Sequence, residues 1–261
     1  MMRTRHLKLA GALLVMATTA LLPRHVAAQT PTRLLVRAVA NDAKVIGSGV
    51  GGARITVRDA RTGQVLANGE QEGSTGDTNS IMVAPRMRGS TVFGTEGAAH
   101  FIATLALEEP TLVEVVAEGP LGTEQALRQA SKTILMIPGE DFLGEGLILN
   151  LYGFTVVIEE PAGDGARNAG SPFEVKAEVT MLCGCPTEPG GMWDSDQISI
   201  TARLLRGDTV VADATLRYAG ERSTYVGSLT VSEAGQYDLV VLAVDAGRAN
   251  SGMARSQVEV R

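Results

Sequence analysis

One stretch near the C-terminus reads Ala234-Gly235-Gln236-Tyr237-Asp238-Leu239-Val240-Val241-Leu242-Ala243-Val244-Asp245. Residues 236–244 of this stretch are rich in apolar and β-branched residues, which is typical of a β-strand. Around it, further short strands are predicted at close spacing, separated by turn residues: 173–180, 197–205, 209–212, 214–218, 224–230 and 254–260. Strands at this spacing favour a β-sandwich. We expect the two short strands at 209–212 and 214–218 to pair with each other.

The sequence Gly235-Gln236-Tyr237 is similar to the penultimate strand of immunoglobulin-like or fibronectin-III-like domains. The resemblance implies that the Tyr237 ring lies at a corner of the sheet, where its hydroxyl bonds back to the chain. It implies a fold and carries no activity with it.

The first half of the chain is also predicted to be β. Ala53, Ile55 and Val57 alternate with three polar residues, which indicates a half-buried strand, and the turn at 60–63 predicts a hairpin with 64–67. Other expected strands are 34–39, 100–107, 111–117, 133–137 and 146–159, the last with a bulge or bend at Gly153. Residues 124–130 have helix-forming composition, and residues 70–79 form a polar loop.

Residues 52–59, Thr62-Gly63 and residues 94–99 resemble the transthyretin-like or carboxypeptidase-regulatory-like sandwich. Members of that family are usually non-catalytic accessory or binding modules, so the resemblance argues against an enzyme. The long insert at 70–93 departs from the compact family pattern.

The segment 161–172 lacks apolar periodicity and is rich in Gly, Pro, Asn and Asp, which indicates a domain boundary. We therefore predict an all-β protein with two tandem β-sandwich domains, residues 29–160 and residues 161–261.

The N-terminus has the pattern of a cleaved signal peptide, residues 1–28. A basic start precedes an apolar run at 9–22, and Val26-x-Ala28 supplies small residues for cleavage. The run is shorter than the roughly 20 residues that span a bilayer, and no later segment is apolar enough to do so. We expect a periplasmic or secreted protein without an integral membrane segment.

Removal of this segment takes away four of the 23 basic residues and no acid, so 19 basic and 29 acidic residues remain, a net charge of −10. Such a chain is a poor partner for nucleic acid or for anionic membranes. His100 is the only histidine left, which excludes histidine-rich zinc sites and leaves little for a catalytic triad. We expect no enzymatic activity.

One segment, residues 181–194, carries distinctive chemistry. It contains both cysteines, Cys183 and Cys185, together with the only tryptophan, Trp193, in a loop rich in Gly and Pro. Three hypotheses stay open: a small disulfide, a soft-metal site and a redox dithiol. Each requires Gly184 to turn the chain so that the two sulfurs lie side by side, and the last two also require the turn to be accessible.

The metal hypothesis predicts a site for Cu(I), which favours thiolate and thioether sulfur. Its ligands are Met181, Cys183, Cys185 and Met192, with Trp193 shielding the ion. Zinc is less suited, because two thiols with no nearby histidine do not complete its four-ligand set.

The expected function is that of an exported, non-catalytic accessory or binding protein that presents sulfur ligands for Cu(I). The alternative is a structural or adhesive β-sandwich module that binds a protein or glycan partner, with the two cysteines as a local disulfide. The physiological protein partner is not identified by the sequence.

Overall fold

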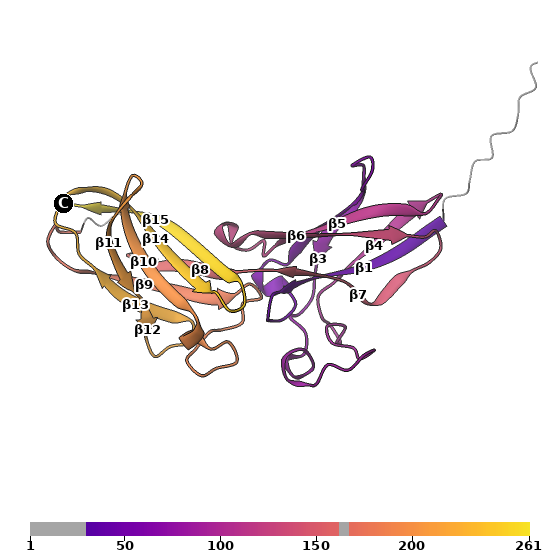
Figure 1. Cartoon of the computed structure of the whole chain (residues 1–261), viewed down its shortest axis with the longest axis horizontal. Helices are drawn as coiled ribbons and strands as arrows, with labels where there is room; N and C mark the ends of the chain where they lie inside the picture. The colour runs from indigo at the N-terminus through magenta and orange to yellow at the C-terminus, as the bar shows by residue number, and fades with distance from the viewer. Residues whose placement is uncertain (1–29, 162–166) are drawn as a thin grey trace, which may run out of the picture.

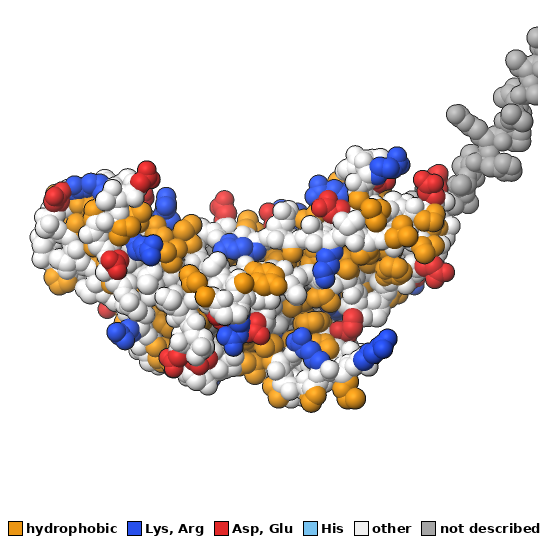
Figure 2. Space-filling model, in the orientation of Figure 1, with side chains coloured by type: hydrophobic (Ala, Val, Ile, Leu, Met, Phe, Trp, Pro, Cys, Tyr) orange, Lys and Arg blue, Asp and Glu red, His pale blue; other side chains and the backbone are white. Residues whose placement is uncertain are grey.

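The computed structural model describes residues 30–161 and 167–261, which form two β-sandwiches placed end to end (Figure 1). The predicted signal peptide, residues 1–28, lies outside the described residues, and so does the centre of the predicted linker, residues 162–166. Acidic and basic side chains are spread over both sandwiches on the face shown in Figure 2. The expected all-β class is confirmed.

Helical structure within the described ranges is limited to short turns: η1 (Ser48–Val50), η2 (Asn79–Val83), η3 (Glu124–Ala126) and η4 (Ser195–Gln197). None of the helices in the part of the chain described is long and apolar enough to cross a membrane.

The first sandwich contains two sheets. One has the order β4-β1-β7, and the other has the order β3-β2-β5-β6. Their strands are β1 (Thr30–Ala40), β2 (Ala53–Asp59), β3 (Val65–Gln71), β4 (Phe101–Leu107), β5 (Thr111–Gly119), β6 (Arg128–Met136) and β7 (Phe142–Leu151). The predicted hairpin is confirmed, because β2 and β3 pair in antiparallel register with Arg58 opposite Val65.

The second sandwich also contains two sheets, with the orders β12-β13-β9-β8 and β11-β10-β14-β15. Their strands are β8 (Phe154–Glu160), β9 (Phe173–Met181), β10 (Ser199–Arg206), β11 (Thr209–Thr215), β12 (Arg217–Tyr218), β13 (Thr224–Leu229), β14 (Gly235–Asp245) and β15 (Asn250–Val260).

Strand β14 behaves as its sequence predicts. It lies inside its sheet, and alternate side chains from Tyr237 to Asp245 are buried. The Tyr237 hydroxyl donates a hydrogen bond to the carbonyl oxygen of Glu233 at 2.8 Å. This bond closes the corner that the immunoglobulin-like resemblance implies.

The predicted strand 146–159 and the predicted boundary at residue 160 require correction. The structure divides this segment into β7, which pairs with β1 in the first sandwich, and β8, which pairs with β9 in the second. The chain changes sandwich at Tyr152 and Gly153, before the predicted boundary. The apolar runs on both sides of Gly153 read as one strand because both contribute buried side chains to the core, although the two runs belong to different sheets.

Two local predictions were wrong. Residues 124–130 form a single 3-10 turn and then the start of β6, because pairing with β5 overrides their helix-forming composition. Residues 209–212 and 214–218 do not pair with each other: β11 pairs with β10, and β12 pairs with β13. Between β11 and β12, the buried Leu216 is where the chain passes from one sheet to the other.

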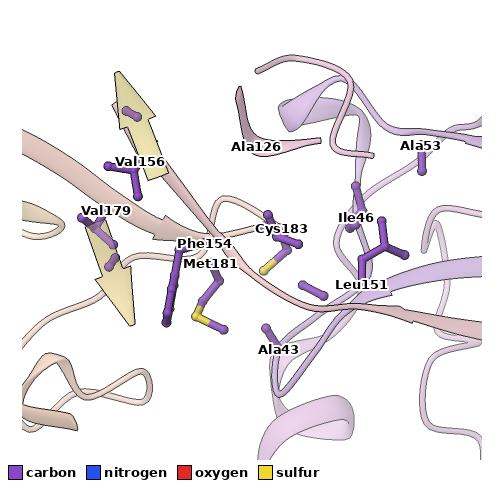
Figure 3. Close-up of a cluster of buried hydrophobic side chains, with 14 of the residues drawn as sticks. Ala43, Ile46, Ala53, Ala126, Leu151, Phe154, Val156, Val179, Met181 and Cys183 are labelled. Carbon is purple, nitrogen blue, oxygen red and sulfur yellow. The ribbon is translucent and has the colours of Figure 1, made fainter. Parts of the chain in front are cut away.

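The hydrophobic core is continuous through the junction of the two sandwiches. Buried side chains from both halves belong to one cluster. At the junction, Ala43, Ile46 and Leu151 come from the first sandwich, and they approach Phe154 and Met181 of the second (Figure 3). The two sandwiches therefore share apolar packing rather than a solvated hinge.

Candidate functional site at the junction of the sandwiches

The Cys-Gly-Cys segment forms a tight turn directly after β9. The backbone N–H of Gly184 donates to the carbonyl of Met181 at 2.8 Å, and the N–H of Met181 donates to the carbonyl of Cys185 at 3.0 Å. Gly184 has a φ of +76°, which glycine adopts without the penalty that a Cβ brings. The two sulfurs lie 2.6 Å apart. The predicted side-by-side placement is confirmed.

The turn is not accessible, contrary to the sequence-based expectation. Cys183 is 3% exposed and Cys185 is 6% exposed. A Cβ added at Gly184 would lie only 2.8 Å from Cγ1 of Val50, so a residue of the first sandwich covers the turn directly. The physical reason is the shared core, which seals the cysteines beneath the junction.

The pKa values of the two thiols move in opposite directions. The hydrogen bond between the sulfurs is the main cause that lowers the pKa of Cys183, and burial opposes it. The same contact, together with burial, raises the pKa of Cys185, because a second thiolate beside the first is unfavourable. Lys44, which follows β1, lowers the pKa of both thiols through its backbone N–H and its charge.

The four predicted sulfur ligands divide into two pairs. Met181 and Met192 line one small cavity of about 20 Å³, and neither cysteine is among the lining residues. Met181 is buried, whereas Met192 is 50% exposed. Among the described residues, no group of three or more His, Cys, Asp or Glu side chains is placed to hold a metal.

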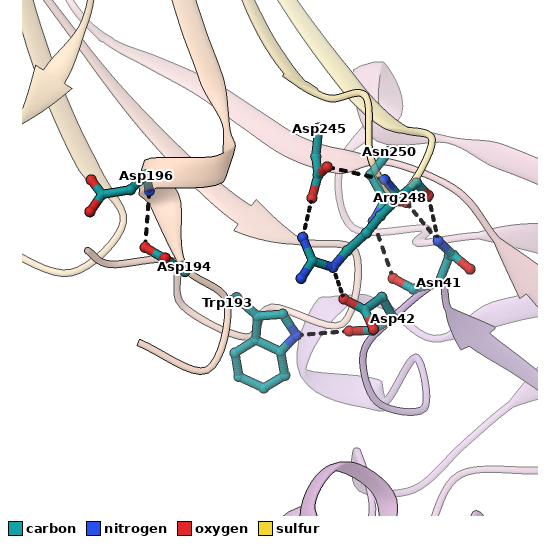
Figure 4. A network of polar contacts seen from close by, with 8 residues as sticks. All are labelled: Asn41, Asp42, Trp193, Asp194, Asp196, Asp245, Arg248 and Asn250. Carbon is teal, nitrogen blue, oxygen red and sulfur yellow. Dashed lines mark hydrogen bonds and ion pairs between the residues drawn. The ribbon is translucent and has the colours of Figure 1, made fainter. Parts of the chain in front are cut away.

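Trp193 bridges the two sandwiches. Its indole Nε1–H donates to the carbonyl oxygen of Asp42 at 3.0 Å (Figure 4). Asp42 lies in the turn after β1 and has a φ of +54°. The only tryptophan of the chain is thus a direct reporter of the junction.

An ion-pair network lies beside Trp193 (Figure 4). Nε of Arg248 lies 2.6 Å from a carboxylate oxygen of Asp42, and Nη1 of Arg248 lies 3.1 Å from one of Asp245. Asp245 and Asp42 raise the pKa of Arg248. Asn41 adds a hydrogen bond from Nδ2 to the Arg248 carbonyl at 2.9 Å. The turn after β1 is therefore held against the β14–β15 turn.

A cleft of about 520 Å³ opens next to this network. The turn after β1, the insert, the passage between β7 and β8, and the β14–β15 turn all line it. Its larger side chains are Met82, Arg86, Phe93, Tyr152 and Arg248. Because it combines residues from both sandwiches, its shape depends on their relative placement.

The insert that lines this cleft is held in place by Glu145. The carboxylate of Glu145 accepts hydrogen bonds from three successive backbone N–H groups, those of Val92, Phe93 and Gly94, at 3.0, 2.7 and 3.1 Å. The buried Arg37 donates to the carbonyls of Ala98 and Ala99 at 3.1 and 2.7 Å. The irregular insert is therefore anchored at its C-terminal end.

Several junction residues carried no signal that a local pattern could reveal. The Asn41-Asp42 pair indicates a turn, but nothing near it in sequence points to Arg248.

His100, which the sequence assigned to the start of a strand, forms an isolated bridge with Glu72 and directs Nδ1 to the carbonyl of Ala98 at 3.0 Å. It contributes nothing to the junction.

Comparison with known proteins gave structural similarities only. No protein-family model and no curated protein matches the chain. An engineered protein is 22% identical with a TM-score of 0.29; the match covers 48% of this chain and 24% of that one. The fibronectin(III)-like modules of Clostridium thermocellum CbhA are 10% identical with a TM-score of 0.27, covering 87% and 89%.

Domains 4 and 5 of the S-layer protein SbsC are 10% identical with a TM-score of 0.25, covering 89% of this chain and 99% of that one. All three similarities concern solved structures. The all-β architecture described above stands on the sheets of this chain itself.

Proposed function

We propose that the protein is an exported, non-catalytic scaffold, a structural or adhesive module whose two β-sandwiches act as one rigid body toward a protein or glycan partner. The observation that supports this most strongly is the continuous core through the junction, reinforced by the contacts of Asp42 with Arg248 and Trp193. Tandem domains move relative to each other by default, unless their interface is large and hydrophobic. Here the interface is hydrophobic and also interlocked by polar contacts.

In this scaffold the cysteines are a local clip beneath the junction. A disulfide that closes so small a ring adds little through chain entropy, so its role is to hold the turn that packs on Val50. Burial of both sulfurs protects the pair from exchange with external thiols. In protein purified from an oxidising compartment without reductant, we expect a mass lower by two hydrogens and no alkylation in the native state.

Chemical unfolding tests the rigid-body proposal. The fluorescence of Trp193 reports the junction, whereas far-ultraviolet circular dichroism reports the sheets. A single cooperative unit requires the two transitions to coincide. A fluorescence transition at clearly lower denaturant concentration than the dichroism transition would refute the scaffold proposal, because the junction would open while both sandwiches stayed folded.

Copper binding is the second candidate, and the convergence of the two thiols supports it. In this proposal Cys183 and Cys185 supply two sulfurs. Because both cysteines are buried and Met181 and Met192 line a separate cavity, the turn must open before an ion can reach the thiols and the two thioethers can complete the set. The test is titration of the reduced protein with Cu(I) against a competing chelator. The double substitution Cys183→Ser with Cys185→Ser should abolish binding. If the affinity is unchanged, the site is wrong.

The methionines allow a matched control for copper. Met192→Leu should weaken binding if its thioether is a ligand. Met253 of β15 is 44% exposed and Met192 is 50% exposed, so Met253→Leu is a matched control. It should leave the affinity for Cu(I) unchanged. Equal effects of the two substitutions would remove Met192 from the proposed ligand set.

A further inference from the structure

The tip of the insert is an exposed apolar and basic projection. Val83 is 61% exposed and Met87 is 75% exposed. Residues 79–95 contain two arginines and no acidic residue, although the whole chain carries a net charge of −6. On the face shown in Figure 2, hydrophobic and basic side chains share the lobe that the insert forms below the first sandwich. The tip of the insert, residues 79–95, is therefore basic in a chain that is acidic as a whole.

The two arginines are not neutralised within the protein. Arg88 forms no hydrogen bond or ion pair with any residue in the described ranges. Arg86 donates one hydrogen bond, from Nη2 to the carbonyl of Ile81 at 2.9 Å, and its guanidinium lies 5.6 Å from the centre of the Phe93 ring. A guanidinium has five N–H donors, so Arg86 is held in position with donors left for an external acceptor.

The projection is preorganised and adjoins the junction cleft. Glu145 fixes the backbone at Phe93, and Phe93 supports Arg86. Arg86 and Met82 line the cleft together with Tyr152, which is 48% exposed. Arginine, methionine and aromatic side chains are the residues enriched where proteins bind one another. Because Arg86 and Phe93 are held in place, these two side chains lose little conformational freedom when the site is occupied.

We propose that the insert tip and the adjoining cleft form a docking site for an acidic segment of a protein partner, in which carboxylates meet Arg86 and Arg88 while apolar side chains contact Met87 and Tyr152. This inference rests on the proposed scaffold function and specifies its partner. The occupant is chosen by charge complementarity and by the apolar surface that surrounds the arginines. Guanidinium groups bind carboxylates with paired hydrogen bonds.

The other anionic surfaces fit this site less well. A membrane or a nucleic acid would meet two cations on a protein that is otherwise acidic, and both are bound through many basic residues. A sulfated glycan could pair with the arginines but offers no apolar side chains to Val83 and Met87. A peptide that alternates acidic and apolar residues satisfies both features.

The experiment measures fluorescence anisotropy of a labelled twelve-residue peptide of alternating glutamate and leucine, with the full mature protein at low salt. Matched probes are the peptide with lysine in place of glutamate, and heparin as a sulfated glycan. We expect saturable binding of the acidic peptide only, weakened by added salt. The double substitution Arg86→Glu with Arg88→Glu should reduce affinity at least tenfold, and Met87→Ser should reduce it about threefold.

Arg203→Glu is the control, because Arg203 is an exposed arginine of β10 on the other sandwich and should not affect binding. Absence of saturable binding, equal binding of the lysine peptide, preference for heparin, or insensitivity to the double substitution would each overturn the inference. The unfolding transitions of the same variants separate this outcome from the scaffold proposal. Coincident transitions with no peptide binding would refute the docking site and leave the rigid scaffold supported.

Discussion

Replacing Gly184 with alanine is expected to destabilise the protein by about 2–5 kcal/mol, of which about 1–3 kcal/mol should come from contact with the first sandwich. The φ of +76° costs an L-residue about 1–2 kcal/mol. The new Cβ would also lie 2.8 Å from Cγ1 of Val50, closer than carbon atoms approach without displacement. Overpacking of this kind costs about 1–3 kcal/mol.

Gly190 supplies a matched control in the same loop. Its φ of +66° is similar, but a Cβ at this position would meet nothing within 4 Å. Gly190→Ala should therefore show only the conformational cost of about 1–2 kcal/mol. The difference between the two variants isolates the contact between the Cys-Gly-Cys turn and Val50.

The assay is urea unfolding followed by circular dichroism, with reductant present throughout so that disulfide chemistry does not contribute. Val50→Ala combined with Gly184→Ala should be less destabilising than the sum of the single changes, by about 1–3 kcal/mol, because the smaller side chain makes room for the new Cβ. If Gly184→Ala and Gly190→Ala cost the same within about 0.5 kcal/mol, and the double variant is additive, the turn does not pack on the first sandwich.

Three further outcomes test other parts of the structure. Tyr237→Phe should lower the free energy of unfolding by about 1–3 kcal/mol, because the Tyr237 hydroxyl donates to the Glu233 carbonyl and accepts a hydrogen bond from Nη2 of Arg206. Tyr218→Phe should cost clearly less in the same unfolding assay, because the Tyr218 hydroxyl makes no hydrogen bond within the described residues, and equal losses would contradict the corner. Hydrogen bonds from Arg33 lower the pKa of Asp141 in the folded protein below its value in the unfolded chain. The Asp141 carboxylate therefore stabilises the fold at pH values above the unfolded pKa, and this contribution is lost as the pH falls through the folded pKa. Asp141→Asn should make the free energy of unfolding fall less steeply as the pH is lowered. An unchanged slope would show that Asp141 does not contribute to the acid sensitivity of the fold. Glu145→Gln should lower the free energy of unfolding by about 1–3 kcal/mol and increase proteolysis of the insert, because the charged carboxylate accepts hydrogen bonds from three backbone N–H groups. An unchanged cleavage rate would mean that another contact anchors the insert.

The local features of the chain were determined by sequence alone. Alternation in β2 identified a strand with one buried face, because side chains of a strand point to opposite faces with a period of two. Apolar and β-branched composition identified β14. The Cys-Gly-Cys turn was predicted from its glycine, since neighbouring residues decide such a turn. The corner at Tyr237 followed from a short motif for the same reason.

Only the tertiary structure decided what covers these elements. A strand pattern shows which face is apolar but not which distant surface packs on it, so residues 154–160 were assigned to the wrong sandwich. The cysteines were expected on an accessible turn, and they are buried because Val50 and Lys44 reach them from the first sandwich. The junction joins residues as far apart as Asn41 and Arg248, 207 positions along the chain, and no local periodicity encodes contacts over that separation.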